Sequence, residues 1–327
     1  MTHREFEKID NEACIHLLLF NWLHQEWSLV YHFSIKLAEF CAKFKPPMPK
    51  YVRGTSFHYF KRFYLHNSVM DHHPKVCSHF CFRNLDPLCF CCQDILVTAI
   101  YLACKTEEFN VSMQQFVSNI AGNQERATQI ILNNELLLIM ELQFHLTIHN
   151  PYRAVEGLLI DIKTRASLPE GVTPGDVEQF RPEIDSFLDK VFLTDAFLIY
   201  APSQIALAAV IHAASKNKIN LDSYVTQQLF GSQGQEAITH IVTIVRNIRV
   251  LVKNIPESVP DKDKELIKAL CMKVDKCRNQ ENNPDSQAYK RKLESMVDEE
   301  EMLRELGGKK AKVESYDGIQ VLSPPVP

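Results

Sequence analysis

Cysteine is the residue type in this sequence with the clearest potential for chemistry, because five of the ten cysteines lie between residues 76 and 93. Thiolates bind zinc, and His72 and His79 are near enough in the sequence to add imidazole ligands. Structural zinc sites use two C-x₂₋₄-C pairs of ligands, whereas the intervals here are three, seven, one and zero residues, so only the first fits and a second pair is missing. The spacing therefore argues against a metal site, and we predict none. The five residues are Cys77, Cys81, Cys89, Cys91 and Cys92.

Catalytic and nucleotide-binding patterns are missing from the rest of the sequence. With ten cysteines and thirteen histidines, a cysteine nucleophile is the one enzymatic alternative, but no G-x-S-x-G or H-E-x-x-H motif occurs. The chain has only 10 glycines in 327 residues, and neither a G-x-G-x-x-G nor a G-x-x-x-x-G-K-[ST] loop is present. We expect a protein that is not an enzyme and that binds no cofactor.

The overall charge and hydropathy exclude two further classes. Lys and Arg number 36 against 40 Asp and Glu, a mildly acidic balance that is not typical of nucleic-acid binding. No apolar run approaches 18 residues, so no membrane-spanning helix is predicted. Acidic residues precede the apolar stretch at 13–23, unlike a signal peptide. We expect an intracellular protein whose cysteines are free thiols.

The elements that position these side chains are predicted to be helices throughout. Leu29, Phe33, Leu37 and Phe40 recur at helical spacing. Residues 95–104 are apolar nearly all round, which is typical of a helix enclosed by other helices. The helices predicted in the first half follow from this pattern: one containing residues 29–40, then 51–65, 95–104, a short helix capped by Ser112 that ends near residue 120, and 123–142.

The helical pattern restarts after a break at His149-Asn150-Pro151. A charged helix is expected at 261–277, and the polar, Pro-rich stretch at 280–327 is predicted to be disordered. The prediction is thus an all-α protein of two five-helix repeats. The helices of the second repeat are expected at 152–165, 176–199, 203–217, 221–229 and 235–254, with Asp176 and Ser203 as N-caps.

Several stretches resemble the cyclin family, and the H-type cyclins in particular. The resemblance covers about residues 29–75 and 94–255. It implies two cyclin boxes. The matching stretches are Phe44-Lys45-Pro46 with Met48-Pro49, YFKRFYLHNSVM (59–70), LACKTEEFNVS (102–112), HNPYR (149–153) and LTDAFLIYAPSQIAL (193–207). The implied organisation is an atypical N-terminal segment at 1–27, a first box at 28–148, a second at 149–255, a C-terminal helix at 256–279 and a tail at 280–327.

The resemblance also implies a function. An H-type cyclin is the regulatory subunit of the CDK-activating kinase: it pushes the kinase C-helix inward so that the kinase's own Lys–Glu pair forms. The implied partners are the cyclin-dependent kinase (CDK) catalytic subunit, the ménage-à-trois assembly factor and the core of transcription factor IIH. The implied substrates are activation loops of cell-cycle kinases and the RNA polymerase II C-terminal tail, and the implied location is the nucleus.

The family's kinase-binding residues match five positions here. Lys105, near the end of the third helix, and Glu135, in the fifth, match the signature pair, which offers charged hydrogen-bonding groups to the kinase. Ile139, Phe144 and Leu146 match its apolar docking surface, and Phe144 is expected to be partly exposed. Without the resemblance, these residues would be assigned to an ordinary salt bridge and to the core. The stretch VYHFSIKL (30–37) lacks the MRxIL-type patch, so no docking of RxL substrates is predicted.

The cysteine-rich stretch interrupts the resemblance. In the family, His-Pro-Lys runs straight into the third helix, whereas here 18 residues separate Lys75 from Asp94. An inserted loop would expose several large apolar side chains. The alternative is a translated intron: a Val codon begins GT, the Gln93 codon can end in AG, and 18 codons keep the frame. Its removal restores HHPKDILVTAIYLACK, and sequencing cDNA across this junction distinguishes the two interpretations.

One alternative function shares the predicted fold. General transcription factors of the IIB type also carry two cyclin boxes, but they bind promoter DNA. Such a protein requires a basic face, and this chain has a net charge of -4. A salt-dependent DNA shift assay separates the two functions.

Overall fold

The computed structural model describes residues 25–69, 71–72, 94–165, 173–231, 234–255, 261–277 and, except 289 and 293, 286–295. These residues contain helices and no β-strand, in agreement with the predicted all-α class. The chain divides into two units, Met1–Asp275 and Lys276–Pro327. Among the described residues, no helix is long and apolar enough to cross a membrane.

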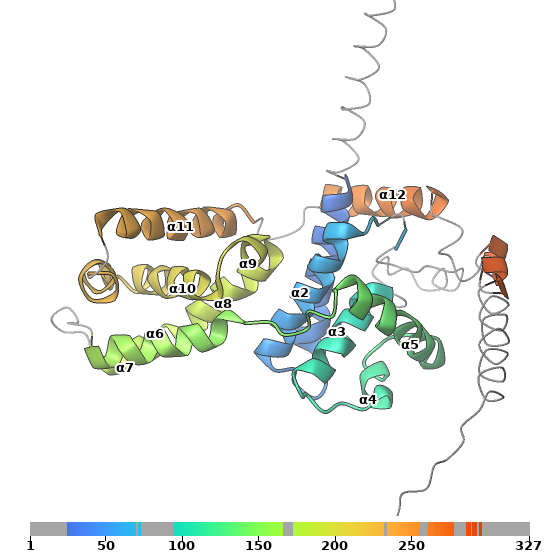
Figure 1. Cartoon of the computed structure of the whole chain (residues 1–327), viewed down its shortest axis with the longest axis horizontal. Coiled ribbons are helices and arrows are strands. Elements are labelled where there is room, and N and C mark those ends of the chain that lie inside the picture. The colour runs from blue at the N-terminus through green and yellow to red at the C-terminus, as the bar shows by residue number, and fades with distance from the viewer. Residues whose placement is uncertain are drawn as a thin grey trace, which may run out of the picture. The chain divides into compact units, whose positions relative to one another are not determined.

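The helices of the first half surround α3 (Asp94–Thr106), which packs against α2 (Lys50–His66) and α5 (Gln124–Glu141) (Figure 1). Every residue from 95 to 104 is buried, as its apolar composition predicts. A helix over residues 25–43 buries Leu29, Phe33, Leu37 and Phe40. The residues predicted to face inward are therefore the ones that form this core.

The short helix α4 (Met113–Val117) has the N-cap predicted for it. The Ser112 hydroxyl accepts a hydrogen bond from the Gln115 N–H at 3.2 Å, and the Gln115 side chain accepts one from the Ser112 N–H at 3.1 Å. This reciprocal capping box satisfies two N–H groups that a helix otherwise leaves unpaired. Phe116 of α4 is fully buried and its ring lies 5.4 Å from that of Phe44.

The second half has its own central helix, α10 (Pro202–Lys216), which packs against α6, α8 and α11 (Figure 1). Residues 205–210 of α10 are buried, like the middle of α3. The other elements are α6 (Pro151–Arg165), α7 (Pro174–Glu178), α8 (Arg181–Leu193), α9 (Ala196–Ile199), the π-helix η2 (Tyr224–Leu229), α11 (Gln235–Lys253) and α12 (Asp261–Cys277).

The prediction of one helix over 176–199 is wrong, because the chain forms α7, α8 and α9 there. Pro182 lies in the first turn of α8, and a proline disfavours helical continuation through the residue before it. At the other end of α8, Thr194 is extended, with a ψ of 179°. The two predicted caps are wrong as well. Thr173 and Ala201 are the N-caps of α7 and α10, so Asp176 and Ser203 lie inside the helices.

Several predictions fall on residues outside the described part. Residues 1–24 and 73–93 lie outside the described ranges, so the atypical N-terminus and the two interpretations of the cysteine-rich stretch are not tested. The same holds for most of 280–327, although residues 287–288, 290–292 and 294–295 are helical where disorder was predicted. Cys41, Cys104 and Cys271 are buried thiols, in agreement with the expectation for the cysteines.

A buried lysine joins α2 to the end of α8. Lys61 is only 5% exposed, and its ammonium donates hydrogen bonds to the carbonyls of Leu193 at 2.9 Å and Thr194 at 2.7 Å. It also donates to the Asp195 carboxylate at 2.9 Å. Three acceptors match the three protons of an ammonium group, and the cation lies where the α8 dipole is negative. Burial nevertheless lowers the Lys61 pKa, opposed by Asp195.

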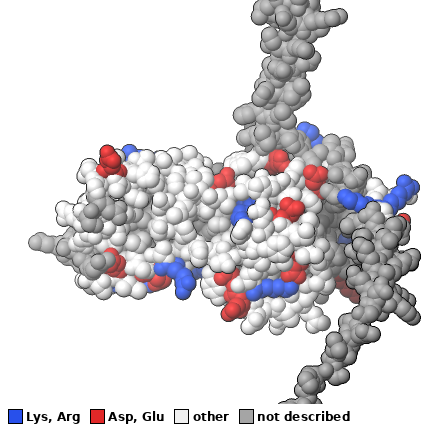
Figure 2. Space-filling model, viewed as in Figure 1, with Lys and Arg blue, Asp and Glu red and all other residues white. Residues whose placement is uncertain are grey.

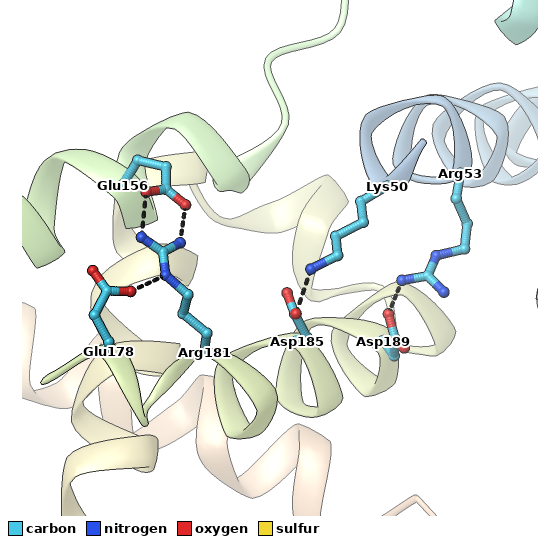
Figure 3. Close-up of polar contacts among 7 residues, drawn as sticks. All are labelled: Lys50, Arg53, Glu156, Glu178, Arg181, Asp185 and Asp189. Carbon is cyan, nitrogen blue, oxygen red and sulfur yellow. Dashed lines mark hydrogen bonds and ion pairs between the residues drawn. The ribbon is translucent and has the colours of Figure 1, made fainter. Parts of the chain in front are cut away.

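Two surface ion pairs and a glycine complete this contact between α2 and the second half. Lys50 pairs with Asp185 and Arg53 with Asp189, one helical turn farther along each helix (Figure 3). A Cβ atom at Gly54 would lie 2.1 Å from Asn150 Oδ1, so only glycine fits without displacing that side chain. We call Gly54, Lys61 and these two ion pairs the α2 junction. Figure 3 also shows Arg181 between Glu156 and Glu178 in the second half.

Candidate functional site

Lys105 and Glu135 form the ion pair that their positions predict. The Lys105 ammonium lies 2.6 Å and 2.9 Å from the two carboxylate oxygens of Glu135, and 4.9 Å from the centre of the Tyr101 ring. The lysine side chain is 47% exposed and the glutamate 17%. The pair therefore lies at the edge of the core, where part of its hydrogen-bonding capacity faces solvent.

The end of α3 explains why Lys105 is exposed. It follows ten consecutive buried residues and belongs to the last turn of the helix. The chain then reverses through Glu108, whose φ of 56° is left-handed, and the Phe109 N–H donates to the Cys104 carbonyl at 2.9 Å. The end of the helix therefore places Lys105 at the surface beside α5, where it pairs with Glu135.

An apolar surface runs along α5 next to this pair. Leu132, Leu136 and Met140 are 56%, 63% and 56% exposed, and Phe144, just beyond the helix, is 69% exposed. The four-residue spacing of Leu132, Leu136 and Met140 places these three in one row along the helix, and Phe144 follows beyond the helix end. We call these four residues the α5 row. Soluble proteins seldom leave four large apolar side chains exposed side by side unless they serve as an interaction surface.

The sequence prediction found only part of this surface. Phe144 is exposed, as predicted. Ile139 and Leu146 are partly buried and pack against the core, so they support the row more than they extend it. Leu132, Leu136 and Met140 were missed. Their four-residue repeat was visible, but residues 136–140 are all apolar, so hydrophobic periodicity alone does not distinguish the outward face.

A large groove lies elsewhere among the described residues. It has a volume of about 880 Å³ and lies in the second half between α8, α10, η2 and α11. Its lining combines apolar side chains with five basic and two acidic ones: Lys190, Lys216, Arg246, Arg249, Lys253, Glu183 and Asp222. Burial, together with nearby Arg249 and Lys216, lowers the His212 pKa. None of the residues predicted to carry function lines this groove.

The described thiols are poorly suited to nucleophilic catalysis. Burial raises the pKa of Cys104 to about 12 and raises that of Cys41 as well. A nucleophilic cysteine needs a pKa shift in the opposite direction, which favours the thiolate at neutral pH.

Within the described residues, no group of three His, Cys, Asp or Glu side chains is arranged to hold a metal ion. On the face seen in Figure 2, acidic and basic side chains are interspersed, and neither sign forms a continuous patch.

Comparison with known proteins identifies one matching domain family and several similar sequences. The family model "Cyclin C-terminal domain" matches residues 150–253. The chain is 41% identical to Cyclin-H of Xenopus laevis over 272 residues, 82% of this chain and 76% of that protein. It is 31% identical to Cyclin-H1-1 of Arabidopsis thaliana, over 68% of this chain and 59% of that protein.

A solved structure shares the fold. A chain of the CAK complex from Chaetomium thermophilum, bound to ATP-gamma-S, superposes with a TM-score of 0.61 at 21% identity. The match covers 91% of this chain and 82% of that one. The sequence identity to the frog and plant proteins, the matching domain and the shared fold agree with one another. This chain belongs to the cyclin H family.

Proposed function

We propose that this chain binds and activates a CDK through the surface formed by the Lys105–Glu135 pair and the α5 row. The observation that carries the proposal is the coincidence of a half-exposed ion pair with four exposed, regularly spaced apolar side chains on the adjoining helix. Interface centres combine apolar anchors with a few charged groups that fix orientation.

The activation mechanism follows from differential binding. A cyclin that contacts the inward position of the kinase C-helix more strongly than the outward one shifts the kinase toward the active arrangement. Lys105 and Glu135 would supply charge-assisted hydrogen bonds to kinase backbone groups. The α5 row would supply the apolar contact area. The cyclin itself contributes no catalytic group, and ATP and the substrate peptide bind to the kinase.

The wider role belongs to the same proposal. The similarity to cyclin H supports a CDK-activating kinase that acts on the activation loops of cell-cycle kinases and, within transcription factor IIH, on the RNA polymerase II C-terminal tail. The partners would then be the kinase catalytic subunit, the ménage-à-trois assembly factor and the factor IIH core, and the location the nucleus. Pull-down of each subunit with the full chain tests this assembly.

The kinase-binding residues are tested by Glu135→Ala. We expect the affinity for the kinase catalytic subunit to fall by about 2–5 kcal/mol, because a charged contact and its partner are lost at the interface. Titration calorimetry measures the affinity, and a polymerase-tail peptide assay measures activation. Binding and activation equal to those of the parent protein would contradict the assignment.

The second half offers a matched control. Lys216, at the end of α10, pairs with Glu183 at 2.6 Å, much as Lys105, at the end of α3, pairs with Glu135. The exposed apolar side chains that line the same groove as Glu183 are Val242 and Val250, at 40% and 49% exposure, and they are smaller and farther apart in the sequence than the members of the α5 row. We therefore expect Glu183→Ala to leave kinase affinity unchanged while removing an equivalent ion pair.

A further inference from the structure

The end of α5 differs from the ends of the two central helices. All three close with a hydrogen bond from an N–H to the carbonyl five residues earlier: Phe109 to Cys104, Ile219 to Ala214, and Phe144 to Ile139. This is the Schellman pattern, which usually has glycine at the left-handed position after the C-cap. Here the corresponding residues are Glu108, Lys218 and Gln143, with φ of 56°, 60° and 55°.

Only the end of α5, among the described residues, has two successive left-handed residues. Phe144 follows Gln143 with a φ of 59°. Residues other than glycine, asparagine and aspartate seldom adopt the left-handed backbone conformation, and bulky aromatic residues strongly disfavour it. Strained positions of this kind persist only where surrounding contacts hold them. The contacts that hold Phe144 therefore bear on how the α5 row is presented.

Arg62 of α2 supplies those contacts. Its guanidinium donates to the Leu142 carbonyl at 3.1 Å and to the His145 carbonyl at 2.8 Å, and so spans the two left-handed residues. A cation is favourable at the end of α5, where unpaired carbonyls and the helix dipole are negative. Next to it, the Tyr59 hydroxyl lies 2.5 Å from the Leu146 carbonyl. The polar contacts use the backbone only, which leaves the Phe144 side chain free.

We propose that Arg62 is a positioning residue that holds residues 142–145 so that Phe144 stays exposed at the end of the α5 row. This rests on the proposed function, in which Phe144 contacts the kinase. A side chain that is fixed before binding loses less conformational freedom on association, so the preformed turn raises affinity. Arg62 need not touch the kinase to have this effect.

The test compares the full-length parent with Arg62→Ala. Amide hydrogen exchange of residues 143–145 in the free protein should accelerate at least tenfold, because their N–H groups bond within the turn that Arg62 holds. Affinity for the purified kinase catalytic subunit should fall at least fivefold. Arg62→Lys keeps the charge but cannot span two carbonyls, so its exchange rate and its kinase affinity should lie between those of the parent and of Arg62→Ala. If Arg62→Ala does not fold, the same two quantities are measured on Arg62→Lys.

A rescue variant separates positioning from a general structural role. Adding Gln143→Gly to Arg62→Ala relieves the strain at one left-handed position, so it should recover at least half of the lost affinity on a logarithmic scale. Lys218→Gly is the matched control, because it relieves the same strain at the end of α10. It should leave kinase affinity at the level of Arg62→Ala alone.

Two results would overturn the proposal: unchanged exchange of residues 143–145 in Arg62→Ala, or equal recovery of affinity by Gln143→Gly and Lys218→Gly. Phe144→Ala in the parent tests the proposed function separately. If that change leaves kinase affinity intact while Arg62→Ala still accelerates exchange, the kinase surface has been misassigned, and Arg62 holds the turn without serving kinase binding.

Discussion

The α2 junction and the α5 row are both helix surfaces, but the side chains of the junction are paired within the chain whereas those of the row are exposed. At the junction, the Lys61 ammonium has three acceptors within 2.9 Å, and Gly54 leaves just enough space for Asn150. Along α5, by contrast, four large apolar side chains are each more than half exposed. The junction satisfies its groups within the chain, whereas the row leaves apolar area for another molecule to cover.

This difference has an energetic consequence. Changes at the junction should act on the stability of the fold, because a buried group loses its partners. Changes in the row should act on binding and leave folding nearly untouched, because exposed side chains contribute little to the folded state. The two regions can therefore be separated by measuring unfolding and kinase affinity on the same variants.

The largest effect is expected at Lys61. Lys61→Met leaves the Leu193 and Thr194 carbonyls and Asp195 without their cation, which should lower the free energy of unfolding by about 3 kcal/mol. Urea unfolding of the parent and the variant measures this difference in the free energy of unfolding. Lys216→Met, which removes an exposed lysine from an ion pair, should cost under about 1 kcal/mol. Similar losses in the two variants would show that burial does not distinguish the junction.

A smaller effect, on binding, is expected in the α5 row. Leu136→Ala should weaken kinase binding by about 1–2 kcal/mol, since it truncates an apolar contact near the centre of the proposed interface. Its free energy of unfolding should change by less than about 0.5 kcal/mol. Ile160→Ala is the matched control, because Ile160 is 58% exposed on α6, and it should bind as the parent does. Equal losses in both variants would argue against a specific surface.

An effect of similar size, on stability, is expected from a change of pH, through a histidine close to the α2 junction. His58 of α2 packs its ring 4.5 Å from that of Phe197, and burial, aided by Arg62, lowers the His58 pKa to about 4. Because this lies below the ordinary value of 6.5, stability is fully present above pH 6.5 and is lost as the pH falls toward 4.

Unfolding measured at two pH values tests this. Between pH 7 and pH 5, the contribution of His58 should fall by about 1–2 kcal/mol. His58→Gln should lose that part of the pH dependence. An identical pH profile for parent and variant would mean that His58 is not buried in neutral form.

The sequence predicted the features that depend on local pattern. The unbroken apolar run at 95–104 indicated a fully enclosed helix, and the Ser112 cap and the Lys105–Glu135 pairing are confirmed. Position in the helix determines these outcomes, so they can be read from spacing and residue type. The pairing also required the family resemblance, since a lysine and a glutamate 30 residues apart do not indicate contact by themselves.

Other features depend on contacts between distant parts of the chain. Lys61 binds groups more than 130 residues away, and Arg62 reaches carbonyls 80 and 83 residues away. Nothing in the stretch YFKRFY distinguishes these two cations from solvated ones. The break of the predicted helix at 176–199 has the same origin in part, because Lys61 takes up the carbonyls at the end of α8 that a continuing helix would use.

Hydrogen exchange of the full chain, measured with and without the kinase catalytic subunit, shows which surface the kinase covers. We predict slowed exchange at residues 103–108 and 132–146, where the ion pair and the α5 row lie, and unchanged exchange along α11. Slowed exchange along α11, at the basic groove of the second half, with residues 132–146 unchanged, would contradict this prediction.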